Sequence, residues 1–229
     1  MSETAQQYRY ERKFIVERLT PAEVKHFIGL HPNMFYQPYP PRHVNNFYLD
    51  NADMENYYDN LHGATNRRKV RVRWYGKLLG HAQTPMLEYK IKRGLVGTKR
   101  SYRLPPLQID QGFTQSYFQS VLAQADLPNE VHYHLKTLKI VLLNRYYRYY
   151  FATYDNQRYR ITLDTALTFQ RVDQLINQFT HRQDNHRNFV IELKYDVTQD
   201  DDAHRVTSYF PFRVDKSSKY VQGIERVYF

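Results

Sequence analysis

The sequence has no cysteine, only 8 glycines in 229 residues, and no long apolar run. Without cysteine, a disulfide framework, a thiolate zinc site and a cysteine nucleophile are excluded. The few glycines form no Gly-rich phosphate loop, which argues against a P-loop or dinucleotide-binding fold. No stretch approaches the roughly 18 apolar residues of a membrane helix, so we expect a chain that does not span a membrane. The N-terminus carries no apolar signal segment, and we therefore expect a cytoplasmic protein.

Positive charge and aromatic residues are what the chain has in excess. Lys and Arg number 33 against 23 Asp and Glu, a formal charge of +10, which favours a polyanionic partner such as nucleic acid, a phosphorylated ligand or an acidic membrane surface. The 22 Tyr and 13 Phe favour strands over helices. The 10 His show no paired spacing of the kind that holds a metal, and we interpret them as surface residues.

The chain alternates strand-like and short helical patterns, without internal repeats. Thr20 is a plausible N-cap for the first helix, and a Pro-rich surface loop follows it at 31–43. We expect strands at 8–16, 44–50, 67–76, 85–94, 97–104, 139–153, 159–165, 167–172 and 188–196, and helices at 21–30, 52–63, 111–125, 130–137, 201–209 and 217–224. This order predicts an α+β fold, a single domain over 1–229 in which peripheral helices surround an antiparallel β-barrel.

Alternation along the strands separates charged from apolar side chains, because residues i and i+2 of a strand share a face. Arg67, Lys69, Arg71 and Arg73 fall on one face of their strand and Val70, Val72 and Trp74 on the other. The pattern Glu-x-Lys occurs in three strands, at 11/13, 88/90 and 192/194, and Arg-x-Arg in two, at 71/73 and 158/160.

Two interpretations fit one such strand. A sheet with one solvated face is common, but it would carry Ser, Thr, Asn and Gln among the charges, and these faces carry few of them. If the strands close into a barrel whose apolar face is covered by helices, the charged face lines the interior. Cations without partners are costly in such a place, so we predict a tunnel that binds a phosphate chain.

Carboxylates on the same faces suggest a metal. Mg²⁺ and Mn²⁺ prefer oxygen ligands and share them with substrate phosphates. Glu192 is our best candidate ligand, with Glu11 and Glu88 as further candidates; the alternative for each is an ion pair with its neighbours. Tyr146, Tyr147, Tyr149 and Tyr150 would suit a platform for stacking bases, but we interpret them as the half-buried outer face of a long strand.

Several ordered motifs carry a resemblance to a known family. YERKFIV, FYLDN, NRRKVRVRWYG, LEYKIKRG, YRITLD, FVIELKYD and KSSKYVQGI lie in order between residues 8 and 224. In these stretches the sequence resembles the catalytic domain of the vacuolar transporter chaperone (VTC) polyphosphate polymerases, within the triphosphate tunnel metalloenzyme superfamily. The resemblance implies an antiparallel tunnel whose basic residues hold a phosphate chain.

Carried over by motif, the resemblance implies a set of phosphate-binding and catalytic residues: Lys13, Arg71, Arg73, Lys90, Arg145, Arg160, Lys216, Ser218 and Lys219. Glu192, in the IELK motif, corresponds to the family's metal-binding glutamate. One departure is Leu143, which stands where the family pattern has a Tyr two positions before the Arg of the long strand. Lys216, Ser218 and Lys219 precede or open a short helix, whose N-terminal amides also favour phosphate.

We therefore expect a metal-dependent polyphosphate polymerase that uses Mn²⁺ or Mg²⁺ and moves the γ-phosphoryl group of a nucleoside triphosphate, ATP in our expectation, to a growing chain. A triphosphatase or polyphosphatase of the same fold is one alternative, and a non-catalytic polyanion-binding module is another. The expected ligands are a nucleoside triphosphate and polyphosphate, without nucleic acid. The chain resembles the compact bacterial stand-alone members, so any membrane coupling would come through a partner protein.

Overall fold

The computed structural model describes residues 9–16, 18–94, 96–172, 183–185, 189–215 and 217–229. The chain divides into two compact units. Unit 1 comprises Met1–Arg42, Tyr146–Leu167 and Asn185–Ser217, and unit 2 comprises His43–Arg145, Thr168–Asp184 and Ser218–Phe229. Four strands contribute residues to both units: β3 (Arg42–Asp50), β9 (Lys139–Thr153), β10 (Tyr159–Arg171) and β11 (Gln183–Asn185).

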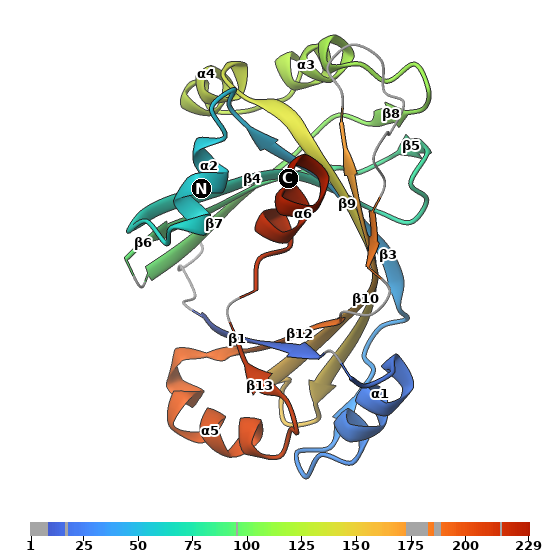
Figure 1. Cartoon of the computed structure of the whole chain (residues 1–229), viewed down its shortest axis with the longest axis vertical. Helices are drawn as coiled ribbons and strands as arrows, with labels where there is room; N and C mark the ends of the chain where they lie inside the picture. Colours follow the sequence, from blue (N-terminus) through green and yellow to red (C-terminus); the bar gives the residue numbers. More distant parts are fainter. Residues whose placement is uncertain (1–8, 17, 95, 173–182, 186–188, 216) are drawn as a thin grey trace. The chain divides into compact units, whose positions relative to one another are not determined.

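Unit 1 is built on an antiparallel sheet in which the hydrogen-bonded order is β13-β1-β12-β10, and β2 pairs with the end of β9 (Figure 1). Its own elements are β1 (Arg9–Val16), α1 (Pro21–Gly29), β2 (Phe35–Tyr36), β12 (Phe189–Asp196), a 3-10 turn (Val197–Gln199), α5 (Asp200–Ser208) and β13 (Arg213–Val214).

The core of unit 1 lies on the apolar face of this sheet, under α1 and α5. Phe14 of β1, Ile191 and Leu193 of β12 and Ile28 of α1 are fully buried there. Thr20 caps α1 with a reciprocal capping box to Glu23, as the sequence predicts. Helices thus cover the apolar face, and Glu11, Lys13, Glu192 and Lys194 lie on the opposite face. Arg12 is an exception, because it lies on the covered face and donates to the Tyr195 hydroxyl and to Asp200 of α5.

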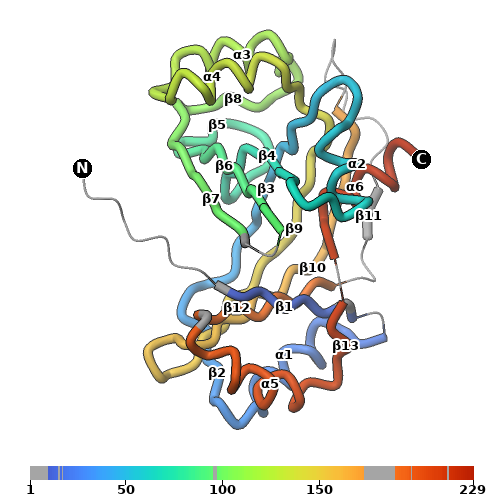
Figure 2. Tube along the Cα trace, turned by 90° about the vertical axis from the view of Figure 1, so that its left-hand side faces the viewer, coloured from blue at the N-terminus to red at the C-terminus, as the bar shows by residue number. Residues whose placement is uncertain are grey.

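Unit 2 repeats this plan with other strands, in the order β3-β4-β6-β7. The tube of Figure 2 follows these strands and the helices α3 and α4 above them. The elements of unit 2 are α2 (Glu55–Leu61), β4 (Asn66–Tyr75), β5 (Gly80–Ala82), β6 (Met86–Arg93), β7 (Val96–Arg103), β8 (Leu107–Ile109), α3 (Gln115–Ala123), α4 (Asn129–Lys136) and α6 (Lys219–Tyr228).

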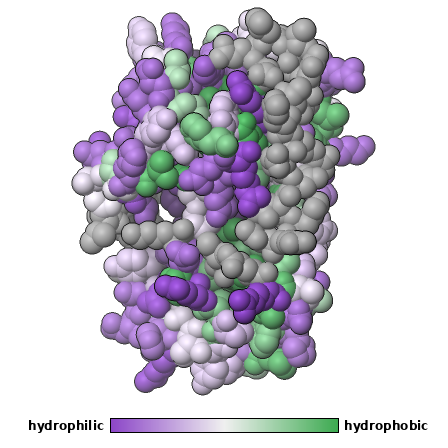
Figure 3. Space-filling model, viewed as in Figure 1, coloured by the Kyte–Doolittle hydropathy of each residue, from purple (hydrophilic) through white to green (hydrophobic). Residues whose placement is uncertain are grey.

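The core of unit 2 contains the apolar face of β4, namely Val70, Val72 and Trp74, packed against α3 and α4. Leu87 of β6 and Phe118 of α3 are fully buried in the same cluster. Hydrophilic side chains dominate the visible surface in the space-filling view of Figure 3. In both units, period-two alternation therefore sorts apolar residues to the core and charged residues to the other face, as predicted.

The C-terminal helix α6 is fixed in unit 2 by a polar and a steric contact. The Tyr220 hydroxyl donates to Asp50, whose carboxylate also accepts the backbone N–H groups of Asn56 and Tyr57 at the start of α2. Gly223 lies so close to β9 and β10 that a Cβ there would stand 2.5 Å from a methyl carbon of Leu142. Only glycine permits this approach, and the close packing at Gly223 fixes the position of α6 within unit 2.

The α+β class with antiparallel strands and peripheral helices is confirmed. The predicted closure into a barrel is not, because the strand pairing of the described residues runs from β13 to β7 without joining these two ends. Two smaller details also differ. Residues 159–171 form one strand, β10, where we expected two, and Ala166, which lies between the two expected strands, takes a positive φ of 50° within it. The interpretation of the histidines as surface residues is wrong for His31, which is 4% exposed and packs against Phe35 and Phe210.

The described part of the chain contains no helix that is both long enough and apolar enough to cross a membrane.

Candidate functional site

The charged face of unit 1 carries two glutamates and two lysines on neighbouring strands, which we call the Glu192 cluster: Glu11, Lys13, Glu192 and Lys194. The strand register places Lys13 opposite Glu192 and Glu11 opposite Lys194. The Lys13 Nζ lies 3.4 Å from a carboxylate oxygen of Glu11 and 3.7 Å from one of Glu192. The Lys194 Nζ lies 3.0 Å from the other Glu192 oxygen. The Glu-x-Lys pairs of β1 and β12 thus form one cluster.

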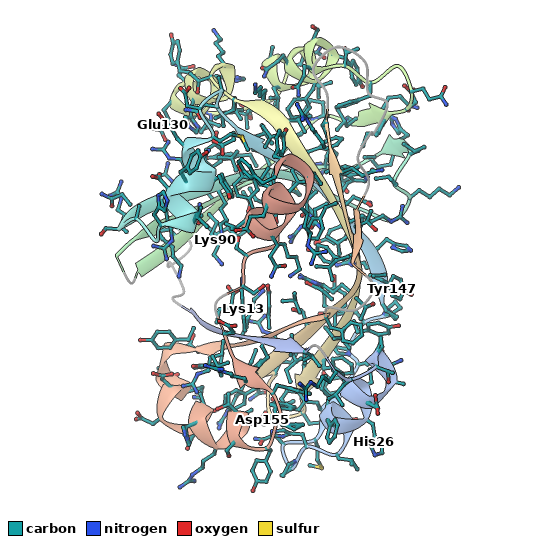
Figure 4. All side chains as sticks on the ribbon, viewed as in Figure 1. Lys13, His26, Lys90, Glu130, Tyr147 and Asp155 are labelled. Carbon is teal, nitrogen blue, oxygen red and sulfur yellow. The ribbon has the colours of Figure 1, made fainter. Side chains whose placement is uncertain are left out.

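Lys13 is held from two sides. Its Nζ also donates to the backbone carbonyl of Ser217 at 2.8 Å, and its side chain remains about a fifth exposed. Figure 4 shows Lys13 on β1, on the side of the sheet opposite α1 and α5. Arg160 of β10 stands opposite Lys194 in the register, so its backbone position extends the same cluster by one strand.

The Glu192 cluster suits a divalent cation. The described residues contain no group of three or more His, Cys, Asp or Glu side chains able to hold a metal. Mg²⁺, however, is usually held by one or two carboxylates, with the remaining positions taken by water and substrate phosphates. Glu11 and Glu192, which share Lys13 between them, supply that number of carboxylates.

A buried ion pair adjoins this cluster in unit 1. Arg148 of β9 makes a two-pronged contact with Asp164 of β10, at 2.6 and 2.7 Å, and its guanidinium lies 5.1 Å from the centre of the Tyr146 ring. Burial by itself would lower the pKa of Arg148, but Asp164 outweighs it and, with a smaller contribution from Glu192, raises that pKa above its ordinary value. Arg148 is therefore a permanent cation whose field reaches Glu192.

Arg145, the arginine that we carried over from the family pattern, lies in the part of β9 that belongs to unit 2. Its Nε contacts Nδ1 of His43 at 3.3 Å, and alternation along β9 puts residue 145 on the face opposite to residues 146 and 148. Sequence reasoning did not single out Arg148. Tyr146 stands two positions before Arg148, whereas the same place before Arg145 is taken by Leu143, so the Tyr-x-Arg spacing of the family pattern occurs at 146/148.

Unit 2 has a cluster of different composition, which we call the Glu88 cluster: Glu88, Arg71, Arg73 and Lys99. The nearer Glu88 oxygen lies 2.7 Å from both Nε and a terminal nitrogen of Arg71 and 3.7 Å from Arg73. The other oxygen lies 2.5 Å from the Lys99 Nζ. One carboxylate on β6 therefore holds three cations from the two flanking strands, β4 and β7.

The electrostatics of Glu88 follow from this crowding. Burial would raise its pKa, but Arg71, Arg73 and Lys99 outweigh that effect and hold the pKa well below the ordinary glutamate value. Each Glu88 oxygen lies within 2.7 Å of a cation, whereas the Glu192 oxygens lie 3.7 and 3.0 Å from their lysines, so Glu88 is better placed to orient arginines than to bind a metal ion. Arg73 is oriented further by Asn46, whose side-chain oxygen accepts from its Nε at 2.9 Å.

The remaining predicted residues lie at two places in unit 2. Lys90 of β6 is exposed and pairs by register with Lys69 and Lys99 (Figure 4). The Lys69 Nζ donates to the Ser218 hydroxyl at 2.9 Å, and the same hydroxyl caps α6 by accepting from the backbone of Val221. Lys219, the first residue of α6, is buried. Lys216 lies outside the described residues.

In both units, the antiparallel sheet pairs an apolar, helix-covered face with a face that carries arginines, lysines and glutamates. Two solved structures match almost the whole chain. The adenylate cyclase candidate of Vibrio parahaemolyticus gives a TM-score of 0.54 at 10% identity, covering 95% of this chain and 98% of that one. A protein of Pyrococcus horikoshii OT3 gives 0.52 at 14% identity, with coverage of 95% and 99%. At such low identity they show a shared fold.

The sequence shows the family to which this chain belongs. Residues 8–228 match the VTC domain family, and the chain is therefore a member of it. No curated protein matches the sequence. Membership of the VTC domain family supports an enzyme that acts on polyphosphate or a triphosphate, and the two solved structures support the fold alone.

Proposed function

We propose that this protein is a metal-dependent polyphosphate polymerase, which transfers the γ-phosphoryl group of a nucleoside triphosphate to the end of a polyphosphate chain. The observation that carries the proposal is the Glu192 cluster, in which two carboxylates flank one lysine on the charged face of a VTC domain. Phosphoryl transfer depends on positioning and charge neutralisation more than on a protein nucleophile, and this arrangement suits both.

In this proposal the basic residues bind and orient the phosphates. The residues concerned are Lys13, Arg148 and Arg160 in unit 1, and Arg71, Arg73, Lys90, Ser218 and Lys219 in unit 2. Arg71 and Arg73 reach their phosphate-binding orientation through Glu88, which restrains both guanidinium groups. We assign Arg145 no contact with phosphate, because it lies on the other face of β9 and contacts His43.

Glu192 would hold the Mn²⁺ or Mg²⁺ ion, with Glu11 as its neighbour in the same cluster. When bound, such an ion neutralises charge on phosphate oxygens and orients them. The part of the protein is to hold Glu192 in place, which Lys13 and Lys194 do from either side. Glu88, with its three cations, serves as an orienting residue.

The decisive experiment is to incubate the purified protein with ATP and Mn²⁺ and to run the products on a gel stained for polyphosphate. The proposal expects long chains. Free phosphate without chains would favour the hydrolase of the same fold. Absence of turnover, together with salt-sensitive binding of DNA, would support the polyanion-binding module and contradict both enzymes.

Glu192→Gln is the variant for this assay, and Glu130→Gln is its matched control. Glu130 is an exposed glutamate on α4 that pairs with Arg100 at 2.9 Å. It belongs to unit 2, whereas the Glu192 cluster belongs to unit 1. We expect Glu192→Gln to abolish metal-dependent chain growth and Glu130→Gln to retain it. Wild-type rates in Glu192→Gln with both Mn²⁺ and Mg²⁺ would overturn the proposed metal site.

Three broader expectations belong to the same proposal. The two units act as one domain over residues 1–229, the protein works in the cytoplasm, and its product passes to a membrane-protein partner. Size-exclusion chromatography of cell fractions, followed by identification of co-purifying proteins, tests the last two.

A further inference from the structure

Beyond the phosphate-binding residues, the Arg148 face of β9 carries a row of tyrosines in unit 1. Tyr146, Arg148 and Tyr150 alternate along the strand and therefore share a face. Our interpretation of the four tyrosines at 146–150 as half-buried outer faces of the strand is wrong for Tyr146, which is 1% exposed. Tyr147 and Tyr149 occupy the other face, where their rings meet edge to face at 5.3 Å.

Tyr150 is the member of this row that reaches solvent together with a second ring. The Tyr39 ring meets it edge to face, with centroids 6.0 Å apart and planes at 89°. Arg42 lies over the Tyr150 ring, 5.3 Å from its centroid, and donates from Nε to its hydroxyl at 3.1 Å. We call these three residues, Tyr39, Arg42 and Tyr150, the Tyr39–Tyr150 platform.

Core packing does not account for the platform. Phe151 and Tyr149, on the opposite face of β9, pack on the core of unit 1 together with Phe35. Tyr39, in contrast, is 57% exposed, and Tyr150 is only half-buried. An exposed ring beside an ordered cation contributes little to a core, but it offers a flat π-surface in a positive field.

We infer that the Tyr39–Tyr150 platform stacks the nucleobase of the nucleoside triphosphate whose phosphates bind at Arg148. Two residues of a strand span about 7 Å, so Tyr150 lies one step from Arg148 on the same face, with no side chain of the strand between them on that face. A nucleotide laid along this face would place its phosphates over the buried cation and its base over the exposed rings. The inference rests on the proposed function for the identity of the ligand.

The composition of the platform also predicts which ligands the site distinguishes. It presents ring faces, one guanidinium and tyrosine hydroxyls, and stacking on a ring face is tolerant of base identity, because every base has a π-surface. ATP and GTP should therefore bind alike. The platform instead distinguishes nucleotides from inorganic triphosphate, which has no ring to stack.

The test is equilibrium binding of two ligands, a non-hydrolysable ATP analogue and inorganic tripolyphosphate, each with Mn²⁺, measured by calorimetry. For Tyr39→Leu combined with Tyr150→Leu, we expect affinity for the analogue to fall about 5- to 100-fold, the size of one base–aromatic stack, and affinity for tripolyphosphate to change less than about twofold. Tyr39→Phe with Tyr150→Phe keeps both rings and should retain most of the affinity.

Two control variants remove exposed tyrosines elsewhere. Tyr133 on α4 is 70% exposed and also lies beside a cation, Lys136, but in unit 2. Tyr154 is 69% exposed, directly follows β9 four residues after Tyr150, and stacks on Tyr36. Tyr133→Leu and Tyr154→Leu should leave the affinity for both ligands unchanged.

Equal weakening of both ligands by the double Leu variant would overturn the inference, as would an unchanged affinity for the analogue. Loss of single-stranded oligonucleotide binding with unchanged analogue binding would assign the platform to nucleic acid and would also overturn it. The outcome for the proposed function is separate: a protein that binds the analogue through the platform but makes no polyphosphate from ATP would refute the polymerase and leave the platform standing. Thermal unfolding of each variant shows that it is folded.

Discussion

The two units use the same side chains to different effect. In unit 1, two glutamates meet two lysines, and the Glu192 carboxylate lies 3.7 Å from Lys13 and 3.0 Å from Lys194. In unit 2, one glutamate meets two arginines and a lysine, and the carboxylate is 7% exposed. Lysine is a compact point charge that a metal ion or phosphate displaces readily, whereas arginine forms a planar, directional contact. The unit 1 cluster is therefore adaptable, and the unit 2 cluster is restrained.

The difference shows that a Glu-x-Lys motif in a strand does not have one fixed role. Glu88 and Glu192 occur in nearly identical local sequences, LEYK and IELK. The neighbouring strand decides their surroundings: β4 brings Arg71 and Arg73 to Glu88, and β1 brings Lys13 to Glu192. We accordingly expect substitutions of the two glutamates to affect turnover and stability in different ways.

The largest expected effect is a difference between Glu192 and Glu88 in how turnover depends on Mn²⁺. Glu192→Gln removes a charged ligand of the proposed ion, so turnover at fixed Mn²⁺ should fall at least about 100-fold, the loss typical of one charge-stabilising group. Glu88→Gln should lower turnover by displacing Arg71 and Arg73, but the Mn²⁺ concentration for half-maximal rate should stay unchanged. Titrating Mn²⁺ against rate measures both; an altered Mn²⁺ requirement in Glu88→Gln would break the comparison.

A second effect concerns stability. Removing the counter-charge of the buried Arg148–Asp164 pair in unit 1 should lower the free energy of unfolding more than removing the charge of Glu88 in unit 2. Asp164→Asn leaves Arg148 buried without its counter-charge and should lower the free energy of unfolding by about 3–5 kcal/mol. Glu88→Gln should cost less, because Lys99 is half exposed and Arg71 about a quarter exposed, so water compensates both. Urea unfolding of the two variants gives the ranking.

The double change Arg148→Met with Asp164→Leu supplies the control for that ranking. Replacing a buried ion pair by apolar residues is often neutral for stability. The double variant should therefore unfold close to wild type and still lose phosphoryl transfer, because Arg148 is gone. A stable and fully active double variant would remove Arg148 from the proposed phosphate site.

A third change tests the packing of α6 in unit 2. Gly223→Ala places a Cβ 2.5 Å from the Leu142 side chain and 2.6 Å from Phe169, and overpacking of this kind costs about 1–3 kcal/mol. Leu142→Ala in the same chain should recover part of the loss by making room. Thermal unfolding measures both; equal stability of Gly223→Ala and wild type would show that α6 shifts without cost.

The smallest effect is a pH dependence that arises in unit 1. Burial lowers the pKa of His31, whose Nε2 contacts the Val206 carbonyl and whose Nδ1 accepts from Asn33. The folded state therefore keeps His31 neutral while the unfolded chain takes up a proton. Stability should fall as the pH drops below about 6.5, the ordinary histidine value, and level off below the lowered pKa.

Urea unfolding between pH 7.5 and 5 measures this dependence. His31→Gln should flatten the decline, and His26→Gln, a change at an exposed position on α1, should not. An unchanged slope in His31→Gln would assign the decline to other groups.

Much of the fold was accessible from sequence because alternation is local. The spacing of Val70, Val72 and Trp74 against Arg71 and Arg73 predicts both faces of β4 before any partner strand is known. The same reasoning found β9 with its bounds at 139–153 and the helices α1 and α3 to α6 within a few residues. Short strands such as β5 and β8 escaped it, because three residues contain too little periodicity to detect.

The sequence by itself determined which side chains face away from the core, since a strand's two faces follow from residue order alone. Only the tertiary structure decided what those side chains meet. It joined Glu88 to three cations and Glu192 to lysines, and paired Arg148 with Asp164. It also put Tyr39 against Tyr150. These pairs depend on the register between strands and on loops that are distant in sequence, where local periodicity carries no information.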